Sequence, residues 1–211
     1  MPAQRTPGEA EKPRVDRREE ILRAARVVLG ERGYEATTVS EIVGRAGVAQ
    51  GTFYLYFPSK KALILALTEL MFTRLTRAAE SAEERSTSLA DAVLGVVGAS
   101  FAQASDFRDV MDIVRSRGDG AGDASASERE QQPYVSFFIG FIRRWQERGD
   151  VDAAIDPVLS GGILAALVGQ TICRLYARYE DAPPASHVEE VARIVHRALE
   201  RPRGAASNAI S

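Results

Sequence analysis

The 211-residue sequence has little of what most catalytic and metal sites require. Its single cysteine, Cys173, excludes an internal disulfide and a cysteine-cluster metal site, and its apolar helical surroundings predict a buried thiol. The two histidines, His187 and His196, lack the spacing of about four that would place two metal ligands on one helix face. No glycine-rich phosphate loop occurs in the sequence. We therefore expect no catalytic residue, no metal and no cofactor, which argues against an enzyme.

Long apolar runs are missing as well. No stretch reaches the roughly 18 consecutive apolar residues of a membrane helix, and the N-terminus lacks the basic-then-apolar pattern of a signal peptide. We expect a cytoplasmic protein with no membrane partner. A hydrophobic content of 45% allows the chain to bury one small and one larger core.

A large net charge of one sign is also absent, since the chain carries a formal charge of -2. The charge is unevenly distributed along the sequence. Residues 1–61 have a net charge of +3, whereas residues 62–211 have a net charge of -5. The basic excess lies in the N-terminal part, as expected if that part meets nucleic acid.

The segment from Thr37 to Leu63 has the pattern of two short helices around a glycine turn, followed by the start of a third. Thr38 and Glu41 have the spacing of a capping box, which predicts a helix from about Val39. Gly47 supplies the left-handed residue at which helices commonly end. This order of elements is typical of a helix-turn-helix, a DNA-binding motif.

The second short helix, expected over 50–56, has an apolar inner face and a polar outer face. Phe53 and Phe57, four residues apart, would anchor the inner face. Amides and hydroxyls on the outer face suit phosphates and base edges, and a glycine near the helix start lets the DNA backbone come close. Ser59 would cap the next helix, whose first turn places Lys60 beside phosphate. The residues predicted to contact DNA are Thr38, Gln50, Gly51, Thr52, Tyr54, Tyr56 and Lys60.

From Arg17 to about Leu67 the sequence resembles the tetracycline-repressor (TetR) family of transcriptional regulators. The matching elements are Arg32-Gly33-Tyr34, Ala36-Thr37-Thr38-Val39, Glu41-Ile42, Ala46-Gly47-Val48, Gly51-Thr52-Phe53-Tyr54, Tyr56-Phe57 and Ser59-Lys60-Lys61-Ala62-Leu63. Two positions depart from the family pattern. Ala49-Gln50 stands where many members have serine and lysine, and Leu55 stands where a polar or aromatic residue is common.

The remaining sequence has helical patterns without strand alternation, so the fold class is predicted to be all-α. An N-terminal three-helix DNA-binding lobe would precede a larger helical lobe for effector binding and dimerisation. The expected divisions are a flexible arm over 1–15, the helix-turn-helix domain over 16–63, the larger domain over 64–202 and a disordered tail over 203–211. Helices after the motif are expected over 59–81, 88–104, 107–117, 128–148, 157–179 and 186–200.

Aromatic residues recur at spacings of three and four in the segment 134–145. Two interpretations are open: these rings form a packed core, or some of them line an apolar ligand pocket. Arginines in apolar helices would then suit a carboxylate or phosphate on the ligand. The residues predicted to line such a pocket are Phe101, Phe107, Met111, Arg115, Phe138, Phe141, Trp145 and Arg174.

A strip of small residues in the segment 161–169 would let another helix approach closely. That helix belongs either to the same chain or to a second copy. The family resemblance favours a homodimer formed by the last two helices as a four-helix bundle, which would fit a palindromic operator. The residues predicted for this interface are Gly161, Ala165, Gly169, Val191 and Val195.

These patterns predict a sequence-specific DNA-binding transcriptional regulator. The resemblance to the TetR family implies a dimeric repressor that an unknown small-molecule effector releases from a palindromic operator in double-stranded DNA. By linkage, effector and DNA would weaken each other's binding by the same factor. The alternative is a helix-turn-helix regulator without a small ligand, controlled by a protein partner.

Overall fold

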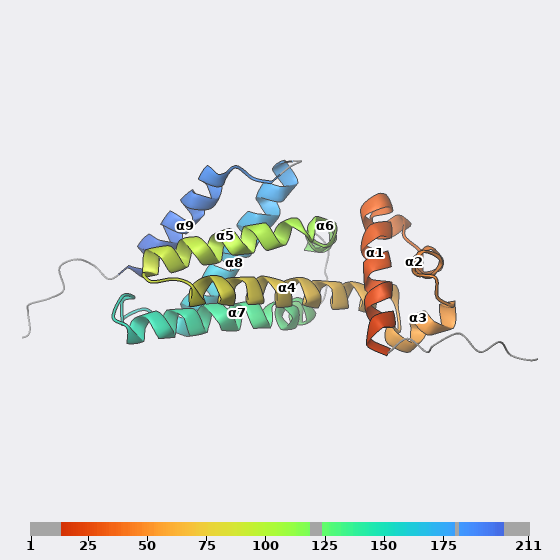
Figure 1. Cartoon of the computed structure of the whole chain (residues 1–211), viewed down its shortest axis with the longest axis horizontal. Coiled ribbons are helices and arrows are strands. Elements are labelled where there is room, and N and C mark those ends of the chain that lie inside the picture. The colour runs from red at the N-terminus through yellow and green to blue at the C-terminus, as the bar shows by residue number, and fades with distance from the viewer. Residues whose placement is uncertain (1–13, 119–123, 180–181, 201–211) are drawn as a thin grey trace, which may run out of the picture. The chain divides into compact units, whose positions relative to one another are not determined.

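A computed structural model of the chain describes residues 14–118, 124–179 and 182–200, with side chains described for 17–113, 129, 131–179 and 182–200. The predicted tail, and the predicted arm up to residue 13, lie outside the described residues. Every regular element in the described part is a helix, apart from an isolated bridge between Val151 and Glu200. The predicted all-α fold is confirmed (Figure 1).

The chain forms two compact units, and the division falls between Ile64 and Leu65. The N-terminal unit contains α1 (Arg14–Ala36), α2 (Val39–Ala46), α3 (Gln50–Tyr56) and the first residues of α4 (Lys60–Glu84). Its small core is a set of fully buried side chains from all four helices, namely Ile21, Ala25, Ile42, Phe53, Leu63 and Ile64.

The boundaries of these helices follow from local signals. Gly33 has a φ of 75° and kinks α1, so the regular part of this helix ends where the sequence predicts. The N–H of Ala62 donates to Ser59 Oγ at 3.1 Å, which caps α4 as expected. α4 continues to Glu84, beyond the predicted end at residue 81, and thus connects the two units covalently.

The C-terminal unit contains most of α4 and five further helices. These are α5 (Leu89–Ser105), α6 (Arg108–Gly118), α7 (Ala124–Glu147), α8 (Pro157–Arg178) and α9 (Ala185–Leu199). α8 packs along α7, and α9 packs along α5. α7 begins at Ala124, four residues before the predicted start, and the other starts and ends of these five helices lie within one residue of their predicted positions.

Aromatic side chains from α7 form the centre of this larger core. The ring of Tyr134 meets that of Phe138 edge-on at 5.1 Å, Phe137 lies 6.1 Å from Phe141, and Phe141 lies 6.0 Å from Trp145. All five side chains are buried. The packed-core interpretation of this aromatic pattern therefore holds.

α8 is apolar on more than one face. Among the described helices it is long and apolar enough, by length and composition alone, to cross a membrane, a test that core helices of soluble proteins also pass. One face of α8 is buried inside the unit, and another leaves large apolar side chains exposed.

Candidate functional site

The start of α2 is fixed by the predicted capping box. The N–H of Thr38 donates to Glu41 Oε2 at 2.9 Å, and the N–H of Glu41 donates to Thr38 Oγ1 at 3.3 Å. The hydrogen bonds that the N–H and the hydroxyl of Thr38 donate to the Glu41 carboxylate, together with Arg32 at 2.6 Å from Glu41 Oε1, lower the pKa of this carboxyl. The ionised carboxylate therefore joins α1 to the first turn of α2. The Thr38 hydroxyl also donates to Glu41, so its hydrogen already has an acceptor within the chain. The contact of Thr38 with DNA stays a prediction.

The turn between α2 and α3 has the geometry that the sequence predicts. Gly47 has a φ of 66°, a left-handed conformation that glycine adopts without a steric penalty. The N–H of Val48 donates to Val43 O at 3.1 Å, which satisfies a carbonyl at the end of α2. The turn directs the chain into α3.

α3 has a buried side and an exposed side. Phe53 and Phe57 are buried, with exposed fractions of 0% and 2%. Their rings lie 5.7 Å apart and hold α3 on the unit's core. Among the residues predicted to contact DNA, Gln50, Gly51 and Tyr54 are exposed, and Thr52 and Tyr56 are half-buried.

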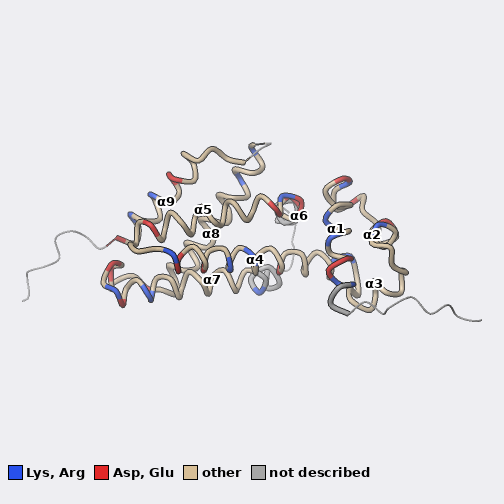
Figure 2. The backbone as a smooth tube through the Cα atoms, viewed as in Figure 1, with Lys and Arg blue, Asp and Glu red and all other residues tan. Residues whose placement is uncertain are grey.

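α3 carries no charged residue, whereas charged residues are frequent on α1 and α2 (Figure 2). The outer face of α3 therefore offers an amide, hydroxyls and an apolar side chain. Ala49, at the N-cap position, makes no side-chain hydrogen bond to the helix. The substitution of alanine for the serine common in the family thus leaves the start of α3 uncapped by a side chain.

Lys60 has a partner that the sequence did not reveal. Its ammonium group donates to Tyr34 O at 2.8 Å and to Thr37 O at 2.9 Å, and it lies 4.3 Å from the Tyr34 ring centroid. The helix dipole makes a cation unfavourable at the N-terminus of its own helix. The same cation is favourable beside the free carbonyl groups at the C-terminus of another helix. Lys60 therefore ties the start of α4 to the end of α1. Its contact with phosphate stays a prediction, for which one of its three N–H donors remains.

Among the residues predicted for an effector pocket, the described part of the chain places only Phe101 in the lining of a described cavity. All the apolar ones are buried in the packed core: Phe101, Phe107, Met111, Phe138, Phe141 and Trp145. Arg174 is exposed, so the predicted polar anchor lies on the surface of α8. The side chain of Arg115 lies outside the described residues. A helix face that packs on neighbours and one that lines a cavity look alike in sequence, so the contact of these residues with an effector stays a prediction.

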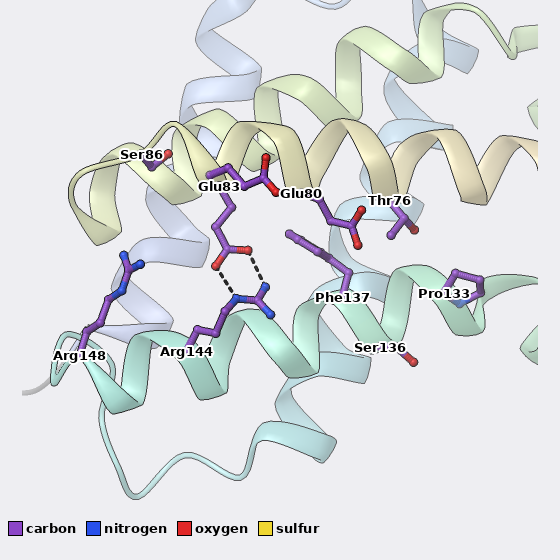
Figure 3. A pocket seen from close by; sticks show the side chains of 10 residues that line it. Thr76, Glu80, Glu83, Ser86, Pro133, Ser136, Phe137, Arg144 and Arg148 are labelled. Carbon is purple, nitrogen blue, oxygen red and sulfur yellow. Dashed lines mark hydrogen bonds and ion pairs between the residues drawn. The ribbon is translucent and has the colours of Figure 1, made fainter.

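A cleft of about 680 Å³ lies elsewhere, between α4 and α7 (Figure 3). Phe137 lines it from α7, and Glu80 lines it from α4. Arg144 on α7 donates hydrogen bonds to Glu83 on α4 and so joins the two walls of the cleft. A smaller groove of about 410 Å³ contains Phe101 in its lining, together with Leu94 and Tyr176. The larger cleft could not be predicted from sequence, because most of its lining comes from α4 and α7, two helices whose pairing is not local.

Four of the five residues predicted for a dimer interface pack inside the chain itself. Gly161 is buried against α7, since a Cβ at this position would come within 2.8 Å of Ile139 N. Ala165, Val191 and Val195 are also buried. Gly169 is half-buried. Gly161 thus serves the packing of α8 on α7, and the part that the predicted residues play in a dimer interface stays a prediction.

Another face of α8 presents apolar side chains to solvent. Leu159 is 66% exposed, and Ile163 is 56% exposed. Val158, Leu167 and, on α9, Ile194 are exposed in the same way. Exposed leucine and isoleucine on successive turns of one helix mark a surface suited to a protein partner.

Comparison with known proteins agrees with this architecture. Residues 21–67 match the model of the family described as bacterial regulatory proteins, tetR family. The chain is 31% identical over 164 residues to YvdT, an uncharacterised HTH-type transcriptional regulator of Bacillus subtilis (strain 168), covering 77% of this chain and 84% of that protein.

Two solved structures share the fold. The fatty acid degradation regulator FadR from Bacillus halodurans aligns with a TM-score of 0.74 at 20% identity, covering 86% of this chain and 99% of that one. The regulator FadR from Bacillus subtilis, solved in complex with stearoyl-CoA, aligns with a TM-score of 0.74 at 17% identity over the same shares. The helix-turn-helix, the helical C-terminal unit and a relative that aligns over most of both chains lead to one assignment: the chain belongs to the TetR family of DNA-binding transcriptional regulators and is not an enzyme.

Proposed function

We propose that this regulator is a cytoplasmic repressor that binds a palindromic operator as a homodimer and leaves it when a small-molecule effector binds the C-terminal unit. The observation that carries the proposal is the outer face of α3. It presents Gln50, Thr52 and Tyr54 beside a glycine, on a helix held from behind by Phe53 and Phe57. A helix of this kind fits the major groove, where hydroxyls and amides meet base edges and phosphates.

The exposed apolar face of α8 supports the homodimer. Leu159, Ile163 and Leu167 recur every four residues and therefore form one line along the helix. Two such faces related by a two-fold axis would cover each other, and the symmetry would present two recognition helices to two half-sites about one DNA turn, or a multiple of it, apart.

The cleft between α4 and α7 supports effector binding. Its volume of about 680 Å³ is within the range of small-molecule sites. One wall belongs to α4, the helix that begins in the DNA-binding unit. A ligand that binds one arrangement of this helix better than another would change DNA affinity by linkage. Because FadR from Bacillus subtilis was solved with stearoyl-CoA, long-chain acyl-CoA is the first class of compound to test.

The test begins with selection of an operator from random double-stranded DNA by the purified chain. Fluorescence anisotropy then measures affinity for that operator against salt, for the wild type, Tyr54→Ala and Tyr54→Phe. We expect a palindromic operator, a steep loss of affinity with salt, and loss of specific binding in Tyr54→Ala. The Tyr54→Phe control separates the hydroxyl from the ring. Failure to select any sequence would overturn the proposal.

The filled aromatic core favours a second candidate, a regulator without a small ligand that is controlled by a protein partner. Titration of stearoyl-CoA and a panel of apolar and charged small molecules into the operator complex separates the two. Release by one of them, with weaker binding of that compound when operator is added, supports the effector. An operator complex that no compound affects favours the protein partner.

A further inference from the structure

Leu55 is the most exposed large apolar side chain in the described part of the chain, with an exposed fraction of 77%. It lies on α3, the proposed recognition helix, at a position where a polar or aromatic residue is common in the family. An exposed leucine on a short helix adds nothing to the core of its own unit. Because α3 is the element proposed to enter the DNA groove, the Leu55 side chain would face DNA rather than the core of its own unit.

The helical geometry places Leu55 opposite the core. Successive residues of a helix are rotated by about 100°, so a residue midway between Phe53 and Phe57 points away from both. Gly51 lies one turn earlier on the same line, and a Cβ there would meet no described atom within 4 Å. Leu55 therefore lies on the face of α3 that points away from the core, and its neighbour one turn earlier on this face, Gly51, has no side chain.

Base edges in the major groove offer mostly hydrogen-bonding groups. The exception is the C5-methyl group of thymine, which an apolar side chain can contact. A leucine side chain has neither a hydrogen-bond donor nor an acceptor. Beside a polar group of a base edge it would displace water without replacing the hydrogen bond that the water made. Beside a methyl group, both apolar surfaces leave water together.

We propose that Leu55 is a specificity-determining residue that selects thymine in each operator half-site by packing its isobutyl group against the thymine methyl. This inference rests on the proposed operator binding. Thr52 and Tyr54, on either side of this ridge, supply the hydrogen-bonding groups, and Leu55 supplies the apolar contact. A second copy of the chain covering Leu55 is the competing explanation, which the test separates.

The experiment uses the selected operator with single thymines replaced by deoxyuridine, which differs only in lacking the methyl group. Affinities are measured by anisotropy for the wild type, Leu55→Ala and Thr52→Ser. Thr52→Ser is the matched control, because it removes the other aliphatic methyl of the outer face. Circular dichroism checks that each variant is folded, which the exposure of Leu55 leads us to expect.

We expect one thymine per half-site at which deoxyuridine weakens wild-type binding about fourfold, the effect of burying one methyl-sized group. The same replacement should leave the affinity of Leu55→Ala unchanged and still weaken Thr52→Ser. A loss that is equal in Leu55→Ala and the wild type, or no thymine sensitive to its methyl, would overturn the assignment while leaving operator binding intact. The absence of any specific operator would instead overturn the proposed function. A change of oligomeric state in Leu55→Ala would favour the second copy and also contradict the assignment.

Discussion

Arg144 on α7 donates two hydrogen bonds to the carboxylate of Glu83 on α4, from Nε at 2.9 Å and from Nη2 at 2.6 Å (Figure 3). The indole N–H of Trp145 donates to the same carboxylate at 3.2 Å. The hydrogen bonds to Glu83 raise the pKa of the Arg144 guanidinium. Gly140 leaves room for this side chain, since a Cβ there would lie 2.8 Å from Arg144 Nη1. One carboxylate thus joins α4 to α7 at the edge of the cleft.

Arg144→Lys should therefore destabilise the C-terminal unit by about 1 kcal/mol, because an ammonium group cannot form the two parallel hydrogen bonds. The value is small because the Arg144 side chain is 48% exposed and solvent screens the pair. Urea unfolding measures the change, and Arg143→Lys, an exposed neighbour on the same helix, is the control. Equal effects of the two substitutions would show that the bidentate geometry contributes nothing.

The buried hydroxyl of Tyr134 donates to Ser100 Oγ at 2.7 Å, and Ser100 in turn donates to Val96 O at 2.8 Å. Burial raises the pKa of the Tyr134 phenol, so the group stays neutral and acts as a donor. Ser100→Ala should cost more than Tyr134→Phe, about 1–3 against about 1 kcal/mol, because it leaves a buried hydroxyl without an acceptor. The double variant should be less destabilised than the sum of the two. Additive losses in urea unfolding would contradict this arrangement.

Signals within a few residues of each other predicted much of this fold. The cap at Thr38 and the stop at Gly47 act within one helical turn, so these helix boundaries could be derived from sequence. α8 begins in the same local way, because Asp156 caps it and Pro157 occupies its first turn. The orientation of helix faces could not. α8 is apolar on two sides, and nothing local decides which side packs on α7. Lys60 illustrates the same limit, because its acceptor Tyr34 O lies 26 residues away.

The capping box should make α2 sensitive to acid. The pKa of Glu41 is lowered in the folded chain from its ordinary value of 4.5. Its stabilising effect is therefore fully present above that value and is lost as pH falls through the lower folded value. Amide hydrogen exchange in α2 should be faster in Glu41→Gln than in the wild type near pH 7, and this difference should disappear as pH falls through the lowered pKa of Glu41.

Thr38→Ala provides the comparison, since it removes the cap at every pH and should cost about 1 kcal/mol. Its effect should persist in acid, where that of Glu41→Gln vanishes. A Glu41→Gln effect that is independent of pH would mean that the carboxylate charge plays no part.

Two adjacent glycines of α8 should respond to alanine in opposite ways. At Gly161 a Cβ would lie 2.8 Å from the backbone nitrogen of Ile139, so α7 or α8 must shift, at a cost of about 1–3 kcal/mol. At Gly162 no described atom lies within 4 Å of the added Cβ. Gly162→Ala should therefore stabilise the helix by about 0.5–1 kcal/mol. Thermal unfolding of the two variants measures the sign of each change in stability. Stabilisation by Gly161→Ala would contradict the close contact of α7 and α8.

The exposed line of apolar residues on α8 leads to a prediction about assembly. Ile163 is 56% exposed and lies one turn from both Leu159 and Leu167, so Ile163→Lys places a charge in the middle of this line without disturbing the unit's core. If two copies pair through this face, each ammonium group would be buried without a partner. The free-energy cost of burying this charge exceeds the stabilisation that an apolar contact at the same place gives the dimer. Light scattering should give the wild type twice the chain mass of 22.9 kDa and Ile163→Lys the single mass.

Leu55→Lys, which places the same charge at an exposed leucine of the N-terminal unit, should remain a dimer. The monomeric variant should also lose affinity for the full palindrome while retaining its weak binding to a half-site, because each chain then binds independently. A dimeric Ile163→Lys would move the interface away from this face of α8, and the exposed leucines would need another partner.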